Sequence, residues 1–504
     1  MADGAGISLS KICSRDMNNV LLAIVGLLAC SLSHAQKINF DNHTNSVETF
    51  VQGFNDQNYG QMKKPIGSIG KVLISKKRLK TEFSGFYDKY GELKIDTIIY
   101  SSLYNGSAEL KSQTHPHKRI FMTFNFSKKG KFQGFGFGYP TFVYKANPPN
   151  TSHLSKTKKY QIIDSIAIIE SNRPAPRNFN GCILISEKDS IVYKKNVGYS
   201  DFENQQPLND TSMFLLASCS KQFTALAIMI LHEEGQLDVK DKVKEHLPNF
   251  PYNNVTIENL LTHTSGLPSY FPLIEKYGDK SKFNTNTDVL NLLIDHKQEL
   301  RFTPNSQFEY SNTGYVILSL IIESASNQSY KDFLESKVFQ PLNMKHTLVY
   351  NRRKENNSIP NYALGYVYSA EHKKYILPDS LSRTQYVSYM DGITGDDGIS
   401  SCVLDLQKWM LALKNNTFIS SKSFNLMTSS HTLANGKKTN YGFGFITRKG
   451  EGIEDIIYHT GSWPGYSTMM IEAIESNDCV IILSNTSYQN LSFLADQILY
   501  TLNR

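Results

Sequence analysis

The order of helix and strand patterns after residue 160 constrains the fold of this chain more than any other feature of its sequence. Residues 162–170 have the apolar spacing of a helix, and residues 180–186 and 191–194 read as two strands joined by a turn at 188–189. Near the other end, residues 468–474 and 479–483 form a second hairpin pattern, and a helical pattern over 491–502 follows it. The simplest architecture for this order is an α+β fold, with one antiparallel sheet flanked by the terminal helices and an all-helical insert between its strands.

The residues before 160 have a different, lysine-rich texture and predict a separate small α+β domain over residues 36–155. Residues 47–62 have helical spacing, and aromatic residues in 119–127 and 132–137 predict two strands. This unit resembles the cystatin-like accessory domains of secreted proteins. Residues 147–159, with two prolines and a lysine cluster, are the predicted linker to a second domain at 160–504.

The first 35 residues have the pattern of a signal peptide. Lys11 and Arg15 precede an apolar run over 20–32, and small residues lead to a predicted cleavage after Ala35. An alternative treats residues 27–30 as a lipoprotein signal, in which Cys30 would be acylated. Either way we expect an exported protein, periplasmic or extracellular, with no transmembrane segment in the mature chain.

Composition and residue spacing predict a globular protein that needs no cofactor or metal. The chain is 40% hydrophobic and 20% charged, and its net charge of +7 is spread too thinly to predict nucleic-acid binding. Cysteines 182, 219, 402 and 479 have no metal-ligand spacing, and we predict no disulfide between them. His115 and His117 flank a proline and read as a solvated turn, because no third ligand is placed beside them.

Ser218 and Lys221 form a Ser-x-x-Lys motif, which puts a hydroxyl and an amine on one face of a helix. The same spacing recurs elsewhere, for example at Ser155 and Lys158, so the motif alone is weak evidence. Only Ser218 precedes a long apolar helix, over 223–231, that would bury the lysine. A buried amine is more easily held neutral than an exposed one, and a neutral amine can accept the serine proton.

Two further motifs follow along the chain, and both offer side chains that acyl-transfer chemistry can use. Tyr310 can carry a proton to a leaving group, while Asn312 can fix the lysine and a substrate carbonyl. His459 then stands at a predicted strand end with Thr460 and Gly461, and the glycine lets a substrate backbone approach the strand closely.

Together these motifs resemble those of the class C β-lactamase, D-alanyl-D-alanine carboxypeptidase and esterase superfamily, the penicillin-recognising serine hydrolases. Four supporting stretches, 260–268, 395–401, 441–445 and 459–465, also resemble this family. The resemblance implies a β-lactamase/transpeptidase-like fold and an acyl-enzyme on Ser218. It also implies an oxyanion hole formed by the backbone N–H groups of Ser218 and Ser462, with Thr460 and Gly461 beside the substrate.

One departure from the family bears on the substrate, because the β-lactamases and peptidases carry lysine where this chain has His459. A neutral imidazole holds a substrate carboxylate less well than an ammonium does. We therefore expect measurable hydrolysis of simple esters, amides or D-amino-acid peptides, and weak or absent hydrolysis of β-lactams. D-Ala-D-Ala carboxypeptidase or β-lactamase activity is the alternative within the class.

Three other residues of these stretches are interpreted as structural, and one alternative of a different class stays open. Cys219 is expected to pack, His263 to brace a loop, and the adjacent Asp396 and Asp397 to be solvated in a glycine turn. The alternative is a non-catalytic module that binds peptidoglycan or a peptide. Intact Ser218, Lys221 and Tyr310 speak against it, since binding alone does not need all three.

Overall fold

The computed structural model describes residues 41–66, 79–80, 83–84, 87–88, 92–100, 105–112, 119–126, 131–138, 155–448, 455–488 and 491–502. The predicted signal peptide, the turn at His115 and His117, and residues 147–154 of the predicted linker lie outside these ranges. The chain divides into two compact units, residues 1–150 and 151–504. Each unit is described by itself.

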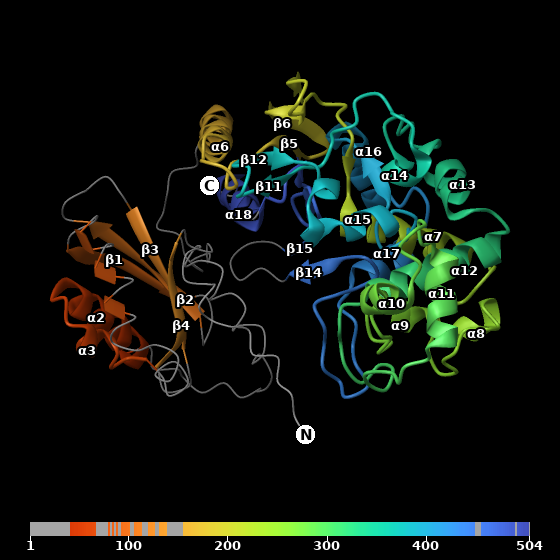
Figure 1. The fold of residues 1–504 in the computed structure, drawn as a ribbon, viewed down its shortest axis with the longest axis horizontal. Coiled ribbons are helices and arrows are strands. Elements are labelled where there is room, and N and C mark those ends of the chain that lie inside the picture. Colours follow the sequence, from red (N-terminus) through yellow and green to blue (C-terminus); the bar gives the residue numbers. More distant parts are fainter. Residues whose placement is uncertain are drawn as a thin grey trace. The chain divides into compact units, whose positions relative to one another are not determined.

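Among its described residues, the first unit has helices α2 and α3, short helical pieces at 79–80, 83–84 and 87–88, and a four-stranded antiparallel sheet that Figure 1 shows. Its elements are α2 (Asp41–Asn55), α3 (Tyr59–Met62), β1 (Leu93–Tyr100), β2 (Asn105–Ser112), β3 (Arg119–Phe126) and β4 (Phe132–Gly138). The strand patterns at 119–127 and 132–137 are confirmed as β3 and β4. The single helix expected over 47–62 is instead two helices, because the chain turns at residues 56–58, where Gln57 has a φ of 50°.

The second unit is built on one antiparallel sheet with the order β14-β15-β16-β17-β5-β6. Its strands are β5 (Gly181–Glu187), β6 (Ser190–Val197), β14 (Ile446–Arg448), β15 (Ile456–Trp463), β16 (Tyr466–Ala473) and β17 (Cys479–Ser484). Both predicted hairpins are confirmed, and β17 joins them by pairing with β5. The last strands of the unit therefore lie beside its first ones.

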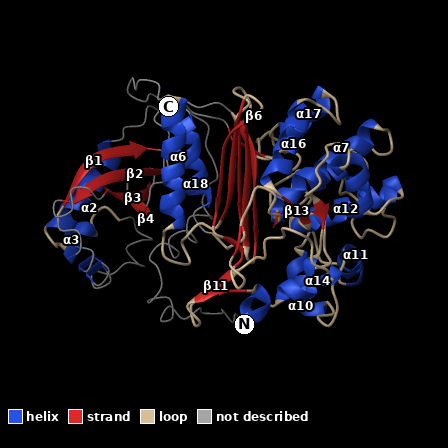
Figure 2. Ribbon diagram, turned by 90° about the horizontal axis from the view of Figure 1, so that it is seen from above, coloured by secondary structure: helices blue, strands red, loops and turns tan. Residues whose placement is uncertain are grey.

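Helices cover both faces of this sheet (Figure 2). Helices α6 (Lys156–Ser171) and α18 (Leu491–Leu502) pack on one face around Ile183, Ile482 and Leu494. The α18 prediction is confirmed at both ends. Helix α6 begins earlier than expected, because the Ser155 hydroxyl accepts a hydrogen bond from the Lys158 N–H and caps the helix, so residues 156–159 are helical rather than linker.

The other face carries the helical insert. Its helices of eight or more residues are α7 (Lys221–Glu233), α10 (Tyr270–Tyr277), α11 (Asn286–Asp295), α12 (Asn312–Ser326), α16 (Val403–Lys414) and α17 (Ser421–Thr428). The shorter helices are α8 (Val243–His246), α9 (Ile257–Leu261), α13 (Tyr330–Leu334), α14 (Arg352–Glu355) and α15 (Tyr386–Tyr389), with 3-10 turns η3 (Ala217–Ser220), η5 (Pro378–Ser380) and η6 (Ser382–Thr384) and the π-turn η4 (Glu335–Phe339). Short strands β7 (Tyr199–Asp201), β8 (Gln206–Pro207), β9 (Phe214–Leu215), β10 (Leu348–Val349), β11 (Val367–Ser369), β12 (Lys374–Ile376) and β13 (Ile399–Ser401) complete it.

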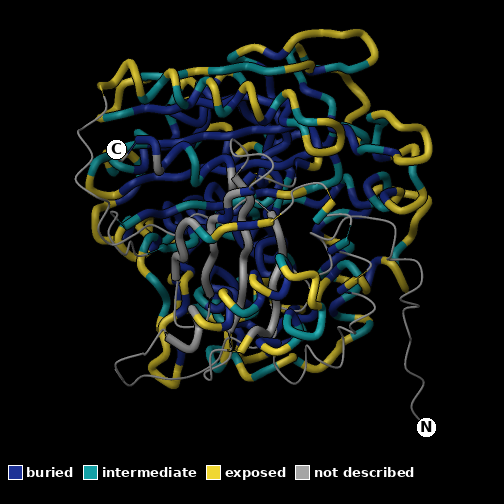
Figure 3. Tube along the Cα trace, turned by 90° about the vertical axis from the view of Figure 1, so that its left-hand side faces the viewer, coloured by how far each residue is buried: buried dark blue, intermediate teal, exposed yellow. Residues whose placement is uncertain are grey.

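Helix α7 is the centre of the insert, and every residue from Lys221 to Leu231 in it is buried. A helix that is apolar all round belongs in a core, and each buried aliphatic or aromatic side chain contributes about 1.5–3 kcal/mol. Phe223 stacks on Trp409 of α16 with ring centroids 3.9 Å apart. Buried residues lie in the interior and exposed residues lie at the surface, in helices as well as in turns (Figure 3). The predicted fold class, an antiparallel sheet flanked by helices with an all-helical insert, is confirmed.

Candidate active site

Ser218 lies in turn η3, immediately before α7, and it is the one partly exposed residue in the stretch 212–231. Every neighbour in that stretch is buried. Ala217, which precedes it, has a φ of 49°, a conformation that costs a residue with a Cβ some strain. The fold thus presents this one hydroxyl to solvent from an otherwise buried segment.

Lys221 is fully buried and lies beside Ser218. Its Nζ donates to Ser218 Oγ at 3.0 Å and to the carbonyl oxygen of Asp396 at 2.7 Å. The same Nζ is 5.1 Å from the ring centroid of Tyr310 and 5.5 Å from that of Tyr315. The amine is therefore oriented by two oxygen acceptors and enclosed by two aromatic rings.

The acidic pair behind this lysine corrects one expectation. Asp396 and Asp397 were expected to be solvated, but Asp396 is only 3% exposed and accepts a hydrogen bond from the Tyr270 hydroxyl at 3.1 Å. Burial raises the pKa of both carboxyl groups, and repulsion by Asp396 adds to the rise at Asp397, while Lys221 opposes it. Asp396 is buried and Asp397 half-buried because their glycine turn packs on α7, where the Thr224 hydroxyl donates to the Gly395 carbonyl at 2.7 Å.

The backbone next to Tyr310 is fixed by hydrogen bonds, and the side chain is partly exposed. Its side chain is 41% exposed, and no hydrogen bond ends at its hydroxyl among the described residues. The Ser311 N–H donates to His263 Nδ1 at 3.1 Å, and the Glu309 N–H donates to the His263 carbonyl at 3.0 Å. The rings of His263 and Tyr310 have centroids 4.2 Å apart. The bracing role predicted for His263 is confirmed by these contacts.

Asn312 is the first residue of α12, and its position differs from the expectation. We expected its amide to hold the lysine, yet in the described chain no hydrogen bond joins Asn312 to Lys221. Its Oδ1 is buried without a hydrogen-bond partner there. An unpaired buried carbonyl costs free energy, so this oxygen remains ready to accept a donor.

His459 is buried beneath the site, and both of its ring nitrogens have partners. Nδ1 lies 2.7 Å from the Thr460 carbonyl, so it carries the proton, and Nε2 accepts from the Tyr441 hydroxyl at 2.9 Å. Burial, and then the charge of Lys221, lowers the pKa of His459 to about 3. The histidine is therefore a neutral, fully bonded group.

Strand β15 carries Thr460, Gly461 and Ser462 past turn η3, which holds Ser218. A Cβ on Gly461 would lie 2.1 Å from the Leu216 carbonyl oxygen, so only glycine lets the strand come this close. The Thr468 hydroxyl of β16 donates to the same oxygen at 2.6 Å, and the Cys219 thiol contacts the His459 carbonyl at 3.3 Å. These contacts place Ser462, which is exposed, alongside the turn that holds Ser218.

The outer edge of β15 is open next to these residues. Among the described residues β14 pairs with β15 only at Ile456–Tyr458, so the edge from His459 to Trp463 has no neighbouring strand on that side. Unpaired N–H and C=O groups at a strand edge can bind an extended substrate backbone.

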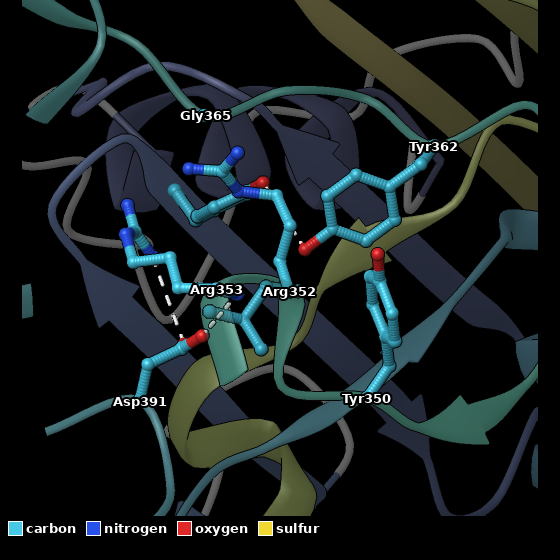
Figure 4. Close-up of a pocket in the computed structure, with 8 residues that line it drawn as sticks. Tyr350, Arg352, Arg353, Tyr362, Gly365 and Asp391 are labelled. Atoms are coloured by element: carbon cyan, nitrogen blue, oxygen red, sulfur yellow. Dashed lines mark hydrogen bonds and ion pairs between the residues drawn. The ribbon is translucent and has the colours of Figure 1, made fainter. Parts of the chain in front are cut away.

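A small pocket lined by charged and aromatic side chains lies near β9, the strand before Ser218 (Figure 4). Arg353 pairs with Asp391 at 3.6 Å, and it also binds Asp379 with Nη2 to Oδ2 at 2.9 Å. The cavity of about 10 Å³ has room for a single water molecule. The charged groups that line this cavity pair with one another. We therefore interpret them as a structural network next to β9 and β10, and not as a substrate site.

The described residues contain no cluster of three metal-ligating side chains. They also contain no helix long and apolar enough to cross a bilayer. Cysteines 182, 219, 402 and 479 are buried free thiols.

Comparison with known proteins decides the family. Residues 172–502 match the family named Beta-lactamase. The chain belongs to the β-lactamase family. Penicillin-binding protein 4* of Bacillus subtilis is 44% identical over 307 residues, which cover 61% of this chain and 68% of that protein. Protein flp of Staphylococcus aureus is 27% identical and is covered over 61% of its length.

Solved structures of the family agree with the fold. A penicillin-binding protein homologue from Pyrococcus abyssi has a TM-score of 0.57 and 27% identity, covering 69% of this chain and 78% of that one. D-amino acid amidase from Ochrobactrum anthropi has a TM-score of 0.56 at 22% identity, over 68% of this chain and 99% of that one, and this likeness shows the fold alone.

Sequence reasoning did not assign a role to several residues that complete the site of this β-lactamase family member. Tyr441 bonds His459, and Tyr270 bonds Asp396. The stretch 441–445 resembles the family, and this resemblance was a usable signal for Tyr441. The same stretch packs closely on the start of α7, since a Cβ on Gly444 would lie 2.8 Å from the Lys221 carbonyl oxygen. Nothing in the local sequence marked Tyr270.

Proposed function

We propose that this chain is an exported serine hydrolase that cleaves an ester or amide bond through an acyl-enzyme on Ser218. The observation that carries the proposal is the 3.0 Å hydrogen bond from Lys221 Nζ to Ser218 Oγ, at the one partly exposed residue of a buried stretch. A nucleophile needs a base within hydrogen-bond reach, and the pair meets that requirement.

In the proposed reaction Ser218 Oγ bonds to the substrate carbonyl carbon while its proton passes to Lys221 Nζ, which must be unprotonated when the attack takes place. The backbone N–H groups of Ser218 and Ser462 stabilise the negative oxygen of the tetrahedral intermediate. The carbon–leaving-group bond then breaks, and the Tyr310 hydroxyl delivers the proton to the leaving group. Water attacks the resulting acyl-enzyme by the same route in reverse and restores Ser218.

Asn312 completes this proposed machinery through its unpaired Oδ1. A buried oxygen acceptor without a partner can receive an N–H donor from an amide substrate or from the protonated Lys221. Thr460 and Gly461 lie on the open edge of β15, where an extended substrate would lie.

The neutral state of His459 supports substrates without a carboxylate beside the scissile bond. A penicillin brings such a carboxylate, and a buried, fully bonded imidazole offers it no positive charge. We therefore propose that esters and uncharged amides are turned over and that β-lactams are hydrolysed weakly or not at all. The printed name of the B. subtilis relative, which includes penicillin binding, makes penicillin the informative second substrate.

The test is hydrolysis of short-chain nitrophenyl esters by the protein from residue 36 onward. Ser218→Ala is expected to lower kcat/KM by about a thousandfold or more, and Tyr310→Phe by about a hundredfold. Ser155→Ala is a matched control, because Ser155 stands in a second Ser-x-x-Lys sequence but caps α6. Equal loss in the Ser155 and Ser218 variants, or full activity in Ser218→Ala, contradicts the proposal.

A folded protein with no activity above the Ser218→Ala background would instead favour the non-catalytic binding module. In that case a peptidoglycan pull-down replaces the ester assay.

We also propose that residues 1–35 direct export and that residues 36–155 form an accessory domain that either positions the hydrolase unit or recruits cell-wall material. The N-terminal residue of the exported protein tests the first point, since Gln36 is expected after cleavage and a modified Cys30 after lipoprotein processing.

A further inference from the structure

Three aromatic side chains from separate elements meet at the end of β15. Phe271 comes from α10, Tyr386 opens α15, and Trp463 is the last residue of β15. The ring centroids are 6.1 Å apart for Phe271 and Trp463, 5.7 Å for Tyr386 and Trp463, and 6.2 Å for Phe271 and Tyr386. We call this group the 271–386–463 cluster; the elements that carry it are labelled in Figure 1.

The cluster lies on the face of the sheet that carries the candidate active site. Side chains alternate along a strand, so Trp463 shares a face with Gly461 and His459. Gly461 packs on Leu216 and on Ala217 of turn η3, and Trp463 packs against the same core that contains α7. Trp463 also follows Ser462 directly, the residue whose N–H we assign to the oxyanion.

The cluster is also connected to the other side of the site. Phe271 stacks on Tyr270 with ring centroids 4.6 Å apart, and the Tyr270 hydroxyl binds Asp396, whose carbonyl binds Lys221. The Tyr270 N–H donates to the Thr313 hydroxyl at 2.9 Å, which fixes α10 to the start of α12. The cluster is therefore connected to Lys221 through Tyr270 and Asp396, and it is connected to β15 through Trp463.

All three rings remain partly exposed although each touches the core. Partly exposed aromatic faces that are held in place beside a reactive centre are typical of a pocket for an apolar group. None of the three side chains carries a charge. A flat, uncharged group would bury apolar area here and gain ring–ring contacts.

We propose that the 271–386–463 cluster is the subsite for the acyl part of the substrate and that it selects an aromatic group of about benzyl size. This inference rests on the proposed function, in which Tyr310 serves the leaving group and Ser462 holds the carbonyl oxygen. The acyl chain, which stays on Ser218 after the first step, then extends past Ser462 towards Trp463.

The first test compares the nitrophenyl esters of phenylacetic acid and acetic acid. The wild type is expected to favour phenylacetyl over acetyl in kcat/KM by about 10- to 100-fold, and Trp463→Ala and Phe271→Ala to reduce that ratio about tenfold each. Tyr277→Ala is the matched control, because Tyr277 is on the same helix as Phe271 but is exposed and stacks on His296. An unchanged ratio in both cluster variants, with activity retained, overturns the subsite.

The second test needs no turnover and so separates this inference from the proposed function. The chain has two tryptophans, so Ser218→Ala and Ser218→Ala/Trp463→Phe differ only in the fluorescence of Trp463. Titration with phenylacetamide is expected to change the emission of the first variant, while acetamide should not, and neither should affect the second. A change in emission without any Ser218-dependent hydrolysis would support the subsite and contradict the proposed hydrolase function. No change in emission would contradict the subsite.

Discussion

The stability of the hydrolase unit should fall in acid because His459 is buried as a neutral group. The pKa of a histidine is ordinarily about 6.5, and burial together with Lys221 lowers that of His459 to about 3. The unfolded chain therefore takes up this proton first as the pH falls. The stabilisation is complete above pH 6.5 and is lost progressively down to about pH 3. Between pH 7 and pH 4 the free energy of unfolding falls over about 2.5 pH units, from pH 6.5 to pH 4. This corresponds to a loss of about 3 kcal/mol.

Urea unfolding at pH 7 and at pH 4, followed by tryptophan fluorescence, measures this loss. Both tryptophans lie in the second unit, so the signal reports that unit alone. His459→Gln removes the titrating group, and its free energy of unfolding should fall by about 3 kcal/mol less than that of the wild type between the two pH values. Burial and Lys221 also lower the pKa of His263 in both proteins, and only the smaller effect of His459 on that pKa is lost in the variant.

His372→Gln serves as the control for replacing a histidine by glutamine, because His372 is exposed. An equal loss of stability in the wild type and in His459→Gln would refute the reasoning. It would mean that the pKa of His459 in the folded protein is close to its ordinary value, so that folding does not shift it.

Two further perturbations test the geometry of the site. Gly461→Ala places a Cβ 2.1 Å from the Leu216 carbonyl oxygen and should lower ester hydrolysis by about a hundredfold as β15 moves from turn η3; wild-type kcat/KM in this variant would contradict the assignment. His263→Phe keeps a ring against Tyr310 but removes the acceptor of the Ser311 N–H, at a cost of about 1–3 kcal/mol. Its kcat should fall more than its KM rises, and the reverse split in steady-state kinetics would assign His263 to binding instead.

Local patterns were sufficient for most of the fold. Strand alternation and helical spacing are properties of neighbouring residues, so both hairpins of the large sheet and α18 could be predicted with nearly correct bounds. The errors came where one short contact overrides the pattern. A single serine cap started α6 at Lys156, and one residue with positive φ at Gln57 divided the first helix.

The candidate site was predictable where its residues are close in sequence and hidden where they are not. Ser218 and Lys221 meet because helical geometry brings residues three apart together. Asp396 accepts a hydrogen bond from Tyr270, 126 residues away, and the 271–386–463 cluster joins three elements with no shared motif. The family resemblance supplied the order of the motifs but not these contacts.

The long stretch of sequence between turn η3 and β15 has a consequence for the synthesis and folding of this protein. The strand that carries Ser462 reaches turn η3 across 240 residues of chain, as the contact of Cys219 with His459 shows. At ordinary rates of translation a ribosome needs roughly 10–50 s to cover that distance, so a nascent chain contains Ser218 long before it contains Ser462, the proposed second oxyanion donor. If the proposed function is right, a chain that ends between these two residues should show no hydrolysis.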